Sequence, residues 1–174
     1  MDIQIGDRTG IVPDTSLRIN EFGGPLVMMS ATDANHWDPE LHYDSACSVD
    51  DYAGLIEFDA QSHRKAIVFG EQPMESGWEY TNGKIVGYLW RWLYAPRGYK
   101  FPNPIELNED HLISEIEFDL SGTRFLIFEA ATDAELEFGR GEEVEFKEAP
   151  SRVKTFSCRP HQDVFFIIHC FLRD

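Results

Sequence analysis

The chain has 174 residues, of which 43% are hydrophobic and 13% aromatic, and this fits one globular domain with its own core. Its 31 Asp and Glu residues outnumber its 15 Lys and Arg residues, so the formal net charge is −16. So negative a charge repels nucleic acids and anionic membranes, and we expect neither as a partner. The same charge speeds encounter with a basic protein, although a role in solubility alone would also explain a net charge of this size.

The cysteine content and the first residues indicate where the protein works. Cys47, Cys158 and Cys170 are too few and too irregularly spaced for a disulfide framework or a zinc site. The N-terminus has early acids and no apolar signal-peptide core, and no window approaches the about 18 apolar residues of a membrane-spanning helix. We therefore expect a cytoplasmic protein without a cofactor or a bound metal.

Short apolar runs recur along the chain between Gly, Pro, Asn and Asp, and helical periodicity is weak. In several of them, such as 113–120, acids and apolar residues alternate and so fall on opposite faces of a strand. The pattern predicts a mainly β, single-domain fold, an antiparallel β-sandwich or open barrel with one or two short helices. The domain spans residues 1–174, with 1–20 either one of its strands or an N-terminal arm. Strands are expected at 17–21, 25–29, 54–59, 65–69, 84–94, 112–120, 123–130, 144–147, 152–157 and 164–172.

Turn residues and a polar insert divide these strands. Ser121–Gly122 stands between two apolar runs, and Asn82–Gly83 comes directly before the run that begins at Lys84. Both steps predict hairpin turns, because Gly takes the positive φ that such turns need. The acidic stretch 31–51 predicts a long loop with a short helix around 45–51.

One segment of that loop resembles a metal site. In an extended strand, His36, Asp38, Glu40 and His42 would point the same way, and such ligands suit a first-row transition metal. However, Pro39 interrupts ladder pairing, and the spacing matches no short metal motif. We therefore prefer a solvated loop, and assign no metal ligand.

No residue pattern identifies a catalytic centre. The chain has neither a G-x-S-x-G nor a P-loop motif, and neighbouring acids are expected by chance at this composition. We assign no catalytic residue, and we expect Cys170 to be a buried core residue and His169 to be a core or edge residue.

The aromatic run 90–94 leaves an alternative open. Trp90, Trp92 and Tyr94 share one face on strand alternation, with Arg91 opposite. Core packing is the preferred explanation. The alternative function is a sugar-binding or hydrolytic β-sandwich in which Trp78, Trp90 or Trp92 stacks on a ligand.

The N-terminal half contains a series of short motifs. They are G-G-P-L from Gly23, H-Y-D-S-A-C from His42, G-E-Q-P from Gly70 and R-W from Arg91. Their order resembles the immunity protein 21 family of bacterial polymorphic toxin systems, although His42 stands where that family usually has an acid. The resemblance implies an immunity protein, not an enzyme, that binds and neutralises a cognate toxin. The motif residues, expected to maintain the scaffold with Ala46 and Cys47 in the core, are Gly23, Gly24, Pro25, Tyr43, Asp44, Ala46, Cys47, Gly54, Gly70, Glu71, Pro73, Arg91 and Trp92.

The acidity is concentrated in one part of the chain. Residues 101–148 contain fourteen acids and three bases, and such a bias favours a patch over an evenly charged surface. The patch would suit a basic toxin, with a nuclease as the specific candidate because a nucleic-acid groove is itself basic. The predicted partner contacts flank a turn at Gly139–Arg140–Gly141, and they are Asp133, Glu135, Glu137, Glu142, Glu143 and Glu145.

Overall fold

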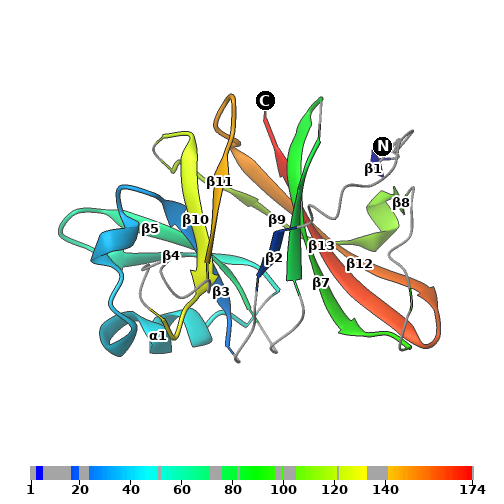
Figure 1. Cartoon of the computed structure of the whole chain (residues 1–174), viewed down its shortest axis with the longest axis horizontal. Helices are drawn as coiled ribbons and strands as arrows, with labels where there is room; N and C mark the ends of the chain where they lie inside the picture. Colours follow the sequence, from blue (N-terminus) through cyan, green and yellow to red (C-terminus); the bar gives the residue numbers. More distant parts are fainter. Residues whose placement is uncertain are drawn as a thin grey trace.

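The computed structural model places two antiparallel sheets side by side, with one short α-helix on the smaller sheet (Figure 1). The fold is mainly β and sandwich-like, as predicted, and the described strands do not close into a barrel. The structure describes residues 3–5, 17–19, 24–50, 52–70, 76–81, 83–96, 99, 105–120, 122–132 and 141–173.

The smaller sheet has five strands and combines distant parts of the sequence. In spatial order these are β11 (Gly141–Glu145), β10 (Arg124–Glu129), β3 (Leu26–Ser30), β5 (Arg64–Phe69) and β4 (Gly54–Asp59). After β3 the chain forms a 3-10 turn, η1 (Ala34–His36), and helix α1 (Pro39–Cys47). The helix begins there because Asp38 caps it, its Oδ1 accepting a hydrogen bond from the Glu40 amide at 2.9 Å, and because Pro39 is tolerated in a first helical turn.

The larger sheet has six strands, and the last strand in the chain lies inside it. In spatial order they are β2 (Leu17–Ile19), β6 (Ser76–Tyr80), β7 (Ile85–Tyr94), β13 (Val164–Leu172), β12 (Arg152–His161) and β9 (Leu112–Glu117). All nine residues of β13 are buried, since β7 and β12 pair with its two edges and apolar clusters cover both of its faces. A separate ribbon pairs β1 (Ile3–Ile5) with β8 (Ile105–Leu107), and a 3-10 turn, η2 (Glu109–His111), follows β8.

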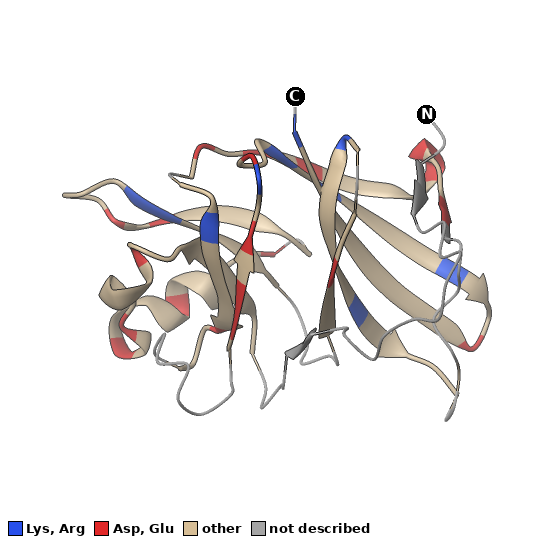
Figure 2. Cartoon of the chain, turned by 45° about the horizontal axis from the view of Figure 1, so that its top comes forward, with Lys and Arg blue, Asp and Glu red and all other residues tan. Residues whose placement is uncertain are grey.

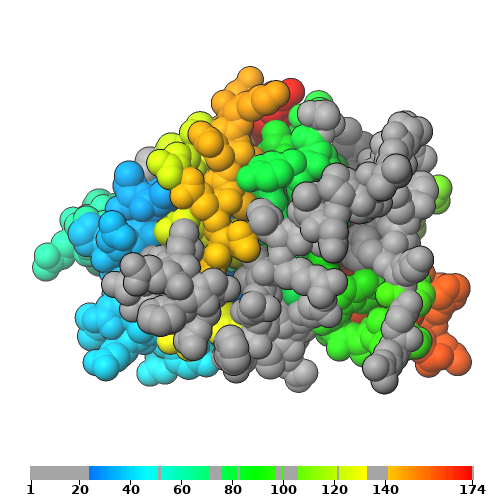
Figure 3. Space-filling view, in the orientation of Figure 1, coloured from blue at the N-terminus to red at the C-terminus, as the bar shows by residue number. Residues whose placement is uncertain are grey.

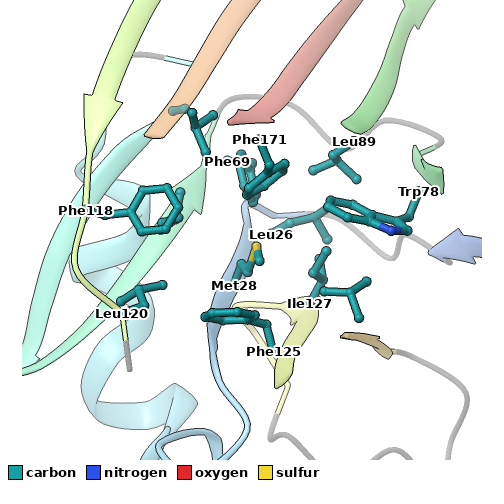
Figure 4. Packing of buried hydrophobic residues seen from close by; sticks show 14 of the residues in the cluster. Leu26, Met28, Phe69, Trp78, Leu89, Phe118, Leu120, Phe125, Ile127 and Phe171 are labelled. Atoms are coloured by element: carbon teal, nitrogen blue, oxygen red, sulfur yellow. The ribbon is translucent and has the colours of Figure 1, made fainter. Parts of the chain in front are cut away.

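The main core fills the space between the two sheets (Figure 4). Leu26 and Met28 of β3 point into it and meet Trp78, Leu89 and Phe171 from the larger sheet. Burying each such side chain contributes about 1.5–3 kcal/mol of transfer free energy, so this layer supplies much of the driving force for folding.

The outer face of each sheet is apolar as well. Val27 and Met29, which alternate with the inward residues of β3, join Trp37 and Ala46 in a cluster beside α1. A third cluster lies on the outer face of the larger sheet. It comprises Tyr88, Trp90, Leu107, Phe156, Cys158, Val164, Phe166, Ile168, Cys170 and Leu172. Central strands with two buried faces read as continuous apolar runs, and this explains the composition of β13.

Two glycines of the larger sheet make room for tryptophans of the neighbouring strand. Gly77 of β6 lies opposite Trp90 of β7, and a Cβ at Gly77 would overlap the indole ring. A Cβ at Gly87 would lie 2.5 Å from Cζ2 of Trp78. The two strands therefore interlock, each with a bare backbone position beneath the other's indole.

The two predicted hairpins have different outcomes. The turn at Asn82–Gly83 is confirmed, because β6 and β7 pair across it and Gly83 has a φ of +120°. The prediction of a hairpin at Ser121–Gly122 is wrong, because β9 belongs to the larger sheet and β10 to the smaller. The chain crosses between the sheets there, with Leu120 buried in the core between them. The helix predicted around 45–51 instead occupies Pro39–Cys47, where the cap is.

Candidate partner-binding surfaces

Strand β11 forms one edge of the smaller sheet and carries Glu142, Glu143 and Glu145 (Figure 2). Its pairing with β10 places Val144 opposite Phe125, and both side chains are buried between the sheets. By alternation, Glu142 lies on the same side of the strand as Val144, whereas Glu143 and Glu145 lie on the other. The three predicted contacts are therefore divided between the two sides of one strand.

Each of these glutamates has a different environment. Arg124 of β10 donates from Nε and Nη2 to Oε1 of Glu143, at 2.9 and 2.6 Å, and this hydrogen bond raises the pKa of the arginine. The backbone amide of Glu145 donates to the Tyr80 hydroxyl at 3.0 Å and so links β11 to β6 of the other sheet. Burial raises the pKa of Glu142. Glu143 is ion-paired with Arg124, and Glu142 is partly buried. Of the three glutamates, Glu145 is therefore the one that is exposed and outside this ion pair.

The structure adds an acidic surface that the predictions missed. Asp133, Glu135 and Glu137, the other predicted contacts, lie outside the described residues. Residues 24–50 contain five acids and no Lys or Arg. Glu40 and Asp44 lie one turn apart on the exposed side of α1 (Figure 2). The absence of Lys and Arg from residues 24–50 is the feature of the sequence that could have indicated this surface.

Several family-motif residues meet beside α1. Gly24, Pro25, Tyr43, Ala46 and Cys47 line a surface cavity of about 450 Å³, together with Val49 and Asp50. Gly24 has a φ of +142°, and a Cβ there would lie 3.3 Å from the Tyr43 hydroxyl oxygen, so the motif glycine and tyrosine pack against each other. A hydrogen bond with Cys47 is the main cause that raises the pKa of Tyr43.

The two small motif residues of α1 differ in exposure. Ala46 is completely buried, as predicted, whereas the prediction that Cys47 lies in the core is wrong. Successive helical residues are separated by about 100°, so Cys47 turns away from the side on which Ala46 packs. Its thiol is exposed at the cavity.

Other motif residues meet at the end of β5. Arg91 is only 1% exposed, and its Nη1 donates to the carbonyl oxygens of Phe69 and Gly70 at 2.8 and 3.0 Å. Its Nε donates to the Ser76 hydroxyl at 3.2 Å. Arg91 of the R-W motif therefore contacts Gly70 of the G-E-Q-P motif directly. Its buried guanidinium donates hydrogen bonds to the backbone carbonyls at the end of β5 and so satisfies these acceptors.

Two of the remaining motif positions, Trp92 and Gly54, pack against other residues of the scaffold. Trp92 is half-buried, with its ring centroid 5.1 Å from that of Phe166, and a Cβ at Gly54 would lie 2.8 Å from Val49 Cγ1. Asp44 is exposed on α1. Gly23, Glu71 and Pro73 lie outside the described residues.

The segment from His36 to His42 is not an extended metal-binding strand. Asp38 caps α1, and Nδ1 of His42 accepts a hydrogen bond from the Asp38 amide at 2.9 Å. The His42 ring packs with Trp37 and Phe58, each at a centroid distance of 5.2 Å. In the part of the chain that the structure describes, no group of three or more His, Cys, Asp or Glu residues is placed to hold a metal ion.

Trp78 and Trp90 pack in the core, as the preferred explanation expects, whereas Trp92 is half-buried. Trp78 and Trp90 are 1% and 6% exposed, so their faces contact protein and are not open to a sugar ring. Tyr94 departs from the predicted alternation because the register shifts between its pair and that of Trp92, and it is 44% exposed.

The buried thiols and the buried histidine have strongly shifted pKa values. Burial raises the pKa of Cys158 to about 12 and that of Cys170 further, so both remain protonated. His169 is buried between the sheets and shares a hydrogen bond of 3.0 Å with Thr155. Burial, and secondarily the charge of Arg91, hold its pKa well below the usual range. These groups are therefore neutral core residues at physiological pH.

The fold and these surfaces define an acidic two-sheet β-protein whose carboxylates are presented at a sheet edge and along an exposed helix. The family model of immunity protein 21 matches residues 18–162, which is most of the chain. The chain therefore belongs to the immunity protein 21 family, and its role is that of an immunity protein. The match extends beyond the motifs at 23–92 and includes β9 to β12.

Comparisons with curated proteins and with solved structures gave no match. Among the described residues, no helix has the length and apolar character needed to cross a membrane.

Proposed function

We propose that this immunity protein binds a cognate toxin through a basic surface of the toxin and neutralises it by covering that surface. The observation that carries the proposal is the net charge of −16 on a chain of the immunity protein 21 family. Opposite charge accelerates encounter between proteins and excludes partners of like charge, while a few buried contacts supply most of the affinity.

A basic nuclease is the toxin that this charge fits best. Its nucleic-acid groove must attract phosphates, so an acidic protein surface is complementary to it. An immunity protein bound in that groove would exclude the nucleic acid, because both would bind the same basic surface. On this proposal the contacts are Asp133, Glu135, Glu137, Glu142, Glu143 and Glu145, in and before the edge strand β11.

Co-expression with the toxin encoded beside this chain's gene tests the proposal. The wild-type protein should restore growth, and the purified proteins should bind with an affinity that falls steeply as salt rises. Failure to bind that toxin would overturn the proposed function.

The contact residues are tested separately. The triple variant Asp133→Lys, Glu137→Lys and Glu145→Lys should bind at least about tenfold more weakly, with a shallower salt dependence. Its matched control carries the same charge change at exposed acids elsewhere, Glu117→Lys, Asp119→Lys and Asp163→Lys. Equal affinity of the two triple variants would reject these contacts but not the immunity role.

A further inference from the structure

The cavity beside α1 combines an apolar wall with polar groups at one surface. Pro25, Ala46 and Val49 contribute apolar atoms to it, whereas Tyr43 and Asp50 contribute a hydroxyl and a carboxylate. Its volume of about 450 Å³ exceeds what one long side chain requires, and it opens next to a helix that lies at the molecular surface (Figure 3).

The electrostatic surroundings of this cavity are negative. Asp50 lines it, Asp44 lies on the adjacent exposed side of α1, and both Asp44 and the buried Glu129 act on the Tyr43 hydroxyl. No Lys or Arg occurs anywhere in residues 24–50, the segment that supplies the lining residues that the structure describes. A cation entering the cavity would therefore meet carboxylates and no basic residue of that segment.

We propose that the cavity beside α1 receives a lysine or arginine side chain of the toxin. This inference rests on the proposed function, and it adds a contact surface beside the motif residues of α1 to the one proposed at β11. The methylene stem would lie along Pro25, Ala46 and Val49, and the cationic end would lie near Asp50 and the Tyr43 hydroxyl. Long basic side chains bury their stems in this way while the charged end finds polar partners.

The first test fills the cavity without changing charge. The exposed Cys47 is replaced by Trp, with Cys47→Ser as the matched control, and affinity is measured for the toxin encoded beside this chain's gene, purified with its active site inactivated. Cys47→Trp should weaken binding about tenfold, while Cys47→Ser should bind within about twofold of the wild type. Unfolding midpoints of both variants verify that the fold is intact.

The second test reverses charge around the cavity. Asp44→Lys with Asp50→Lys should weaken binding about 30-fold and flatten its salt dependence, because a cationic side chain would then meet lysines. The control, Asp119→Lys with Asp163→Lys, changes net charge equally and should lose about threefold or less. Both pairs lie on exposed positions, so neither change removes core packing.

The outcomes separate this inference from the proposed function. If the wild-type protein does not bind the toxin, both are overturned. If the wild type binds but Cys47→Trp and the Asp44–Asp50 variant bind as tightly as their controls, only the cavity is rejected. Selective loss in these two variants supports the cavity as the site.

Discussion

The packing of Trp90 over Gly77 makes a strong prediction about stability. Replacing Gly77 by Ala places a methyl group where the indole ring lies, and the ring cannot yield easily because only 6% of Trp90 is exposed. Overpacking of a core usually costs about 1–3 kcal/mol. Expulsion of the indole would approach the about 3–5 kcal/mol of a large-to-small substitution. We therefore expect Gly77→Ala to lower the free energy of unfolding by about 3 kcal/mol.

Denaturant unfolding, followed by far-UV circular dichroism, measures this loss directly. In a domain of this size it corresponds to a fall in Tm of about 6–12 °C. Gly83→Ala is the control, because nothing lies within 4 Å of its Cβ position and only the positive φ of +120° opposes the substitution. That control should lose about 1 kcal/mol.

A double-mutant cycle tests the steric cause. In a Trp90→Ala background the space above Gly77 is empty, so Gly77→Ala should cost less than about 1 kcal/mol there. A cost of about 3 kcal/mol in both backgrounds would refute the explanation, because the loss would then arise from the backbone of β6 and not from the indole.

Three further predictions concern buried polar and sulfur groups. Arg91→Lys should lower the free energy of unfolding by about 2–4 kcal/mol, since an ammonium cannot reproduce three hydrogen bonds fixed by a guanidinium; an unchanged denaturation midpoint would contradict it. The pKa of His169 is lowered in the folded protein, so on acidification the unfolded chain binds a proton first. The contribution of neutral His169 to the free energy of unfolding is therefore complete above about pH 6.5. Below that pH the contribution is lost, by at most about 1.4 kcal/mol for each pH unit. The difference in unfolding free energy between wild type and His169→Gln should follow this pH dependence, and a difference independent of pH would refute it. Only Cys47 of the three cysteines should react with a thiol reagent in the native state, with Cys158 and Cys170 reacting after denaturation; rapid reaction of all three would show that the core is open.

The fold class was predictable because most strands are short apolar runs bounded by turn residues. The prediction failed where local rules compete with long-range contacts. The Ser121–Gly122 step has the residues of a hairpin, yet Leu120 enters the core between the sheets and directs the chain across them. The predicted strands did not include β6, because its sequence contains Gly77 and one tryptophan but no apolar run. The reason for a glycine in this strand lies in β7, where the Trp90 ring occupies the space that a side chain at position 77 would need.

The candidate surfaces were predictable only in part, for a similar reason. Counting charges along the sequence found the stretch that contains β11, but alternation divides its glutamates and Arg124 pairs with one of them. Residues 24–50, which form the surface beside α1, contain fewer acids than residues 101–148. This surface is distinguished by the absence of Lys and Arg from the segment and by the cavity that opens there. That cavity joins Gly24 to Asp50, and no linear pattern could show that the chain folds back there.

The position of β13 has a consequence for the order in which the protein can be made. It is the last of the described strands to be synthesised, yet β7 and β12 both pair with it in the interior of the larger sheet. Until Val164–Leu172 has emerged from the ribosome, β7 and β12 lack this partner and their apolar faces remain open. Contacts between such distant segments slow folding and leave the incomplete chain prone to aggregate. A chain truncated just before Val164 should therefore fail to fold its larger sheet, as a chain truncated much earlier would.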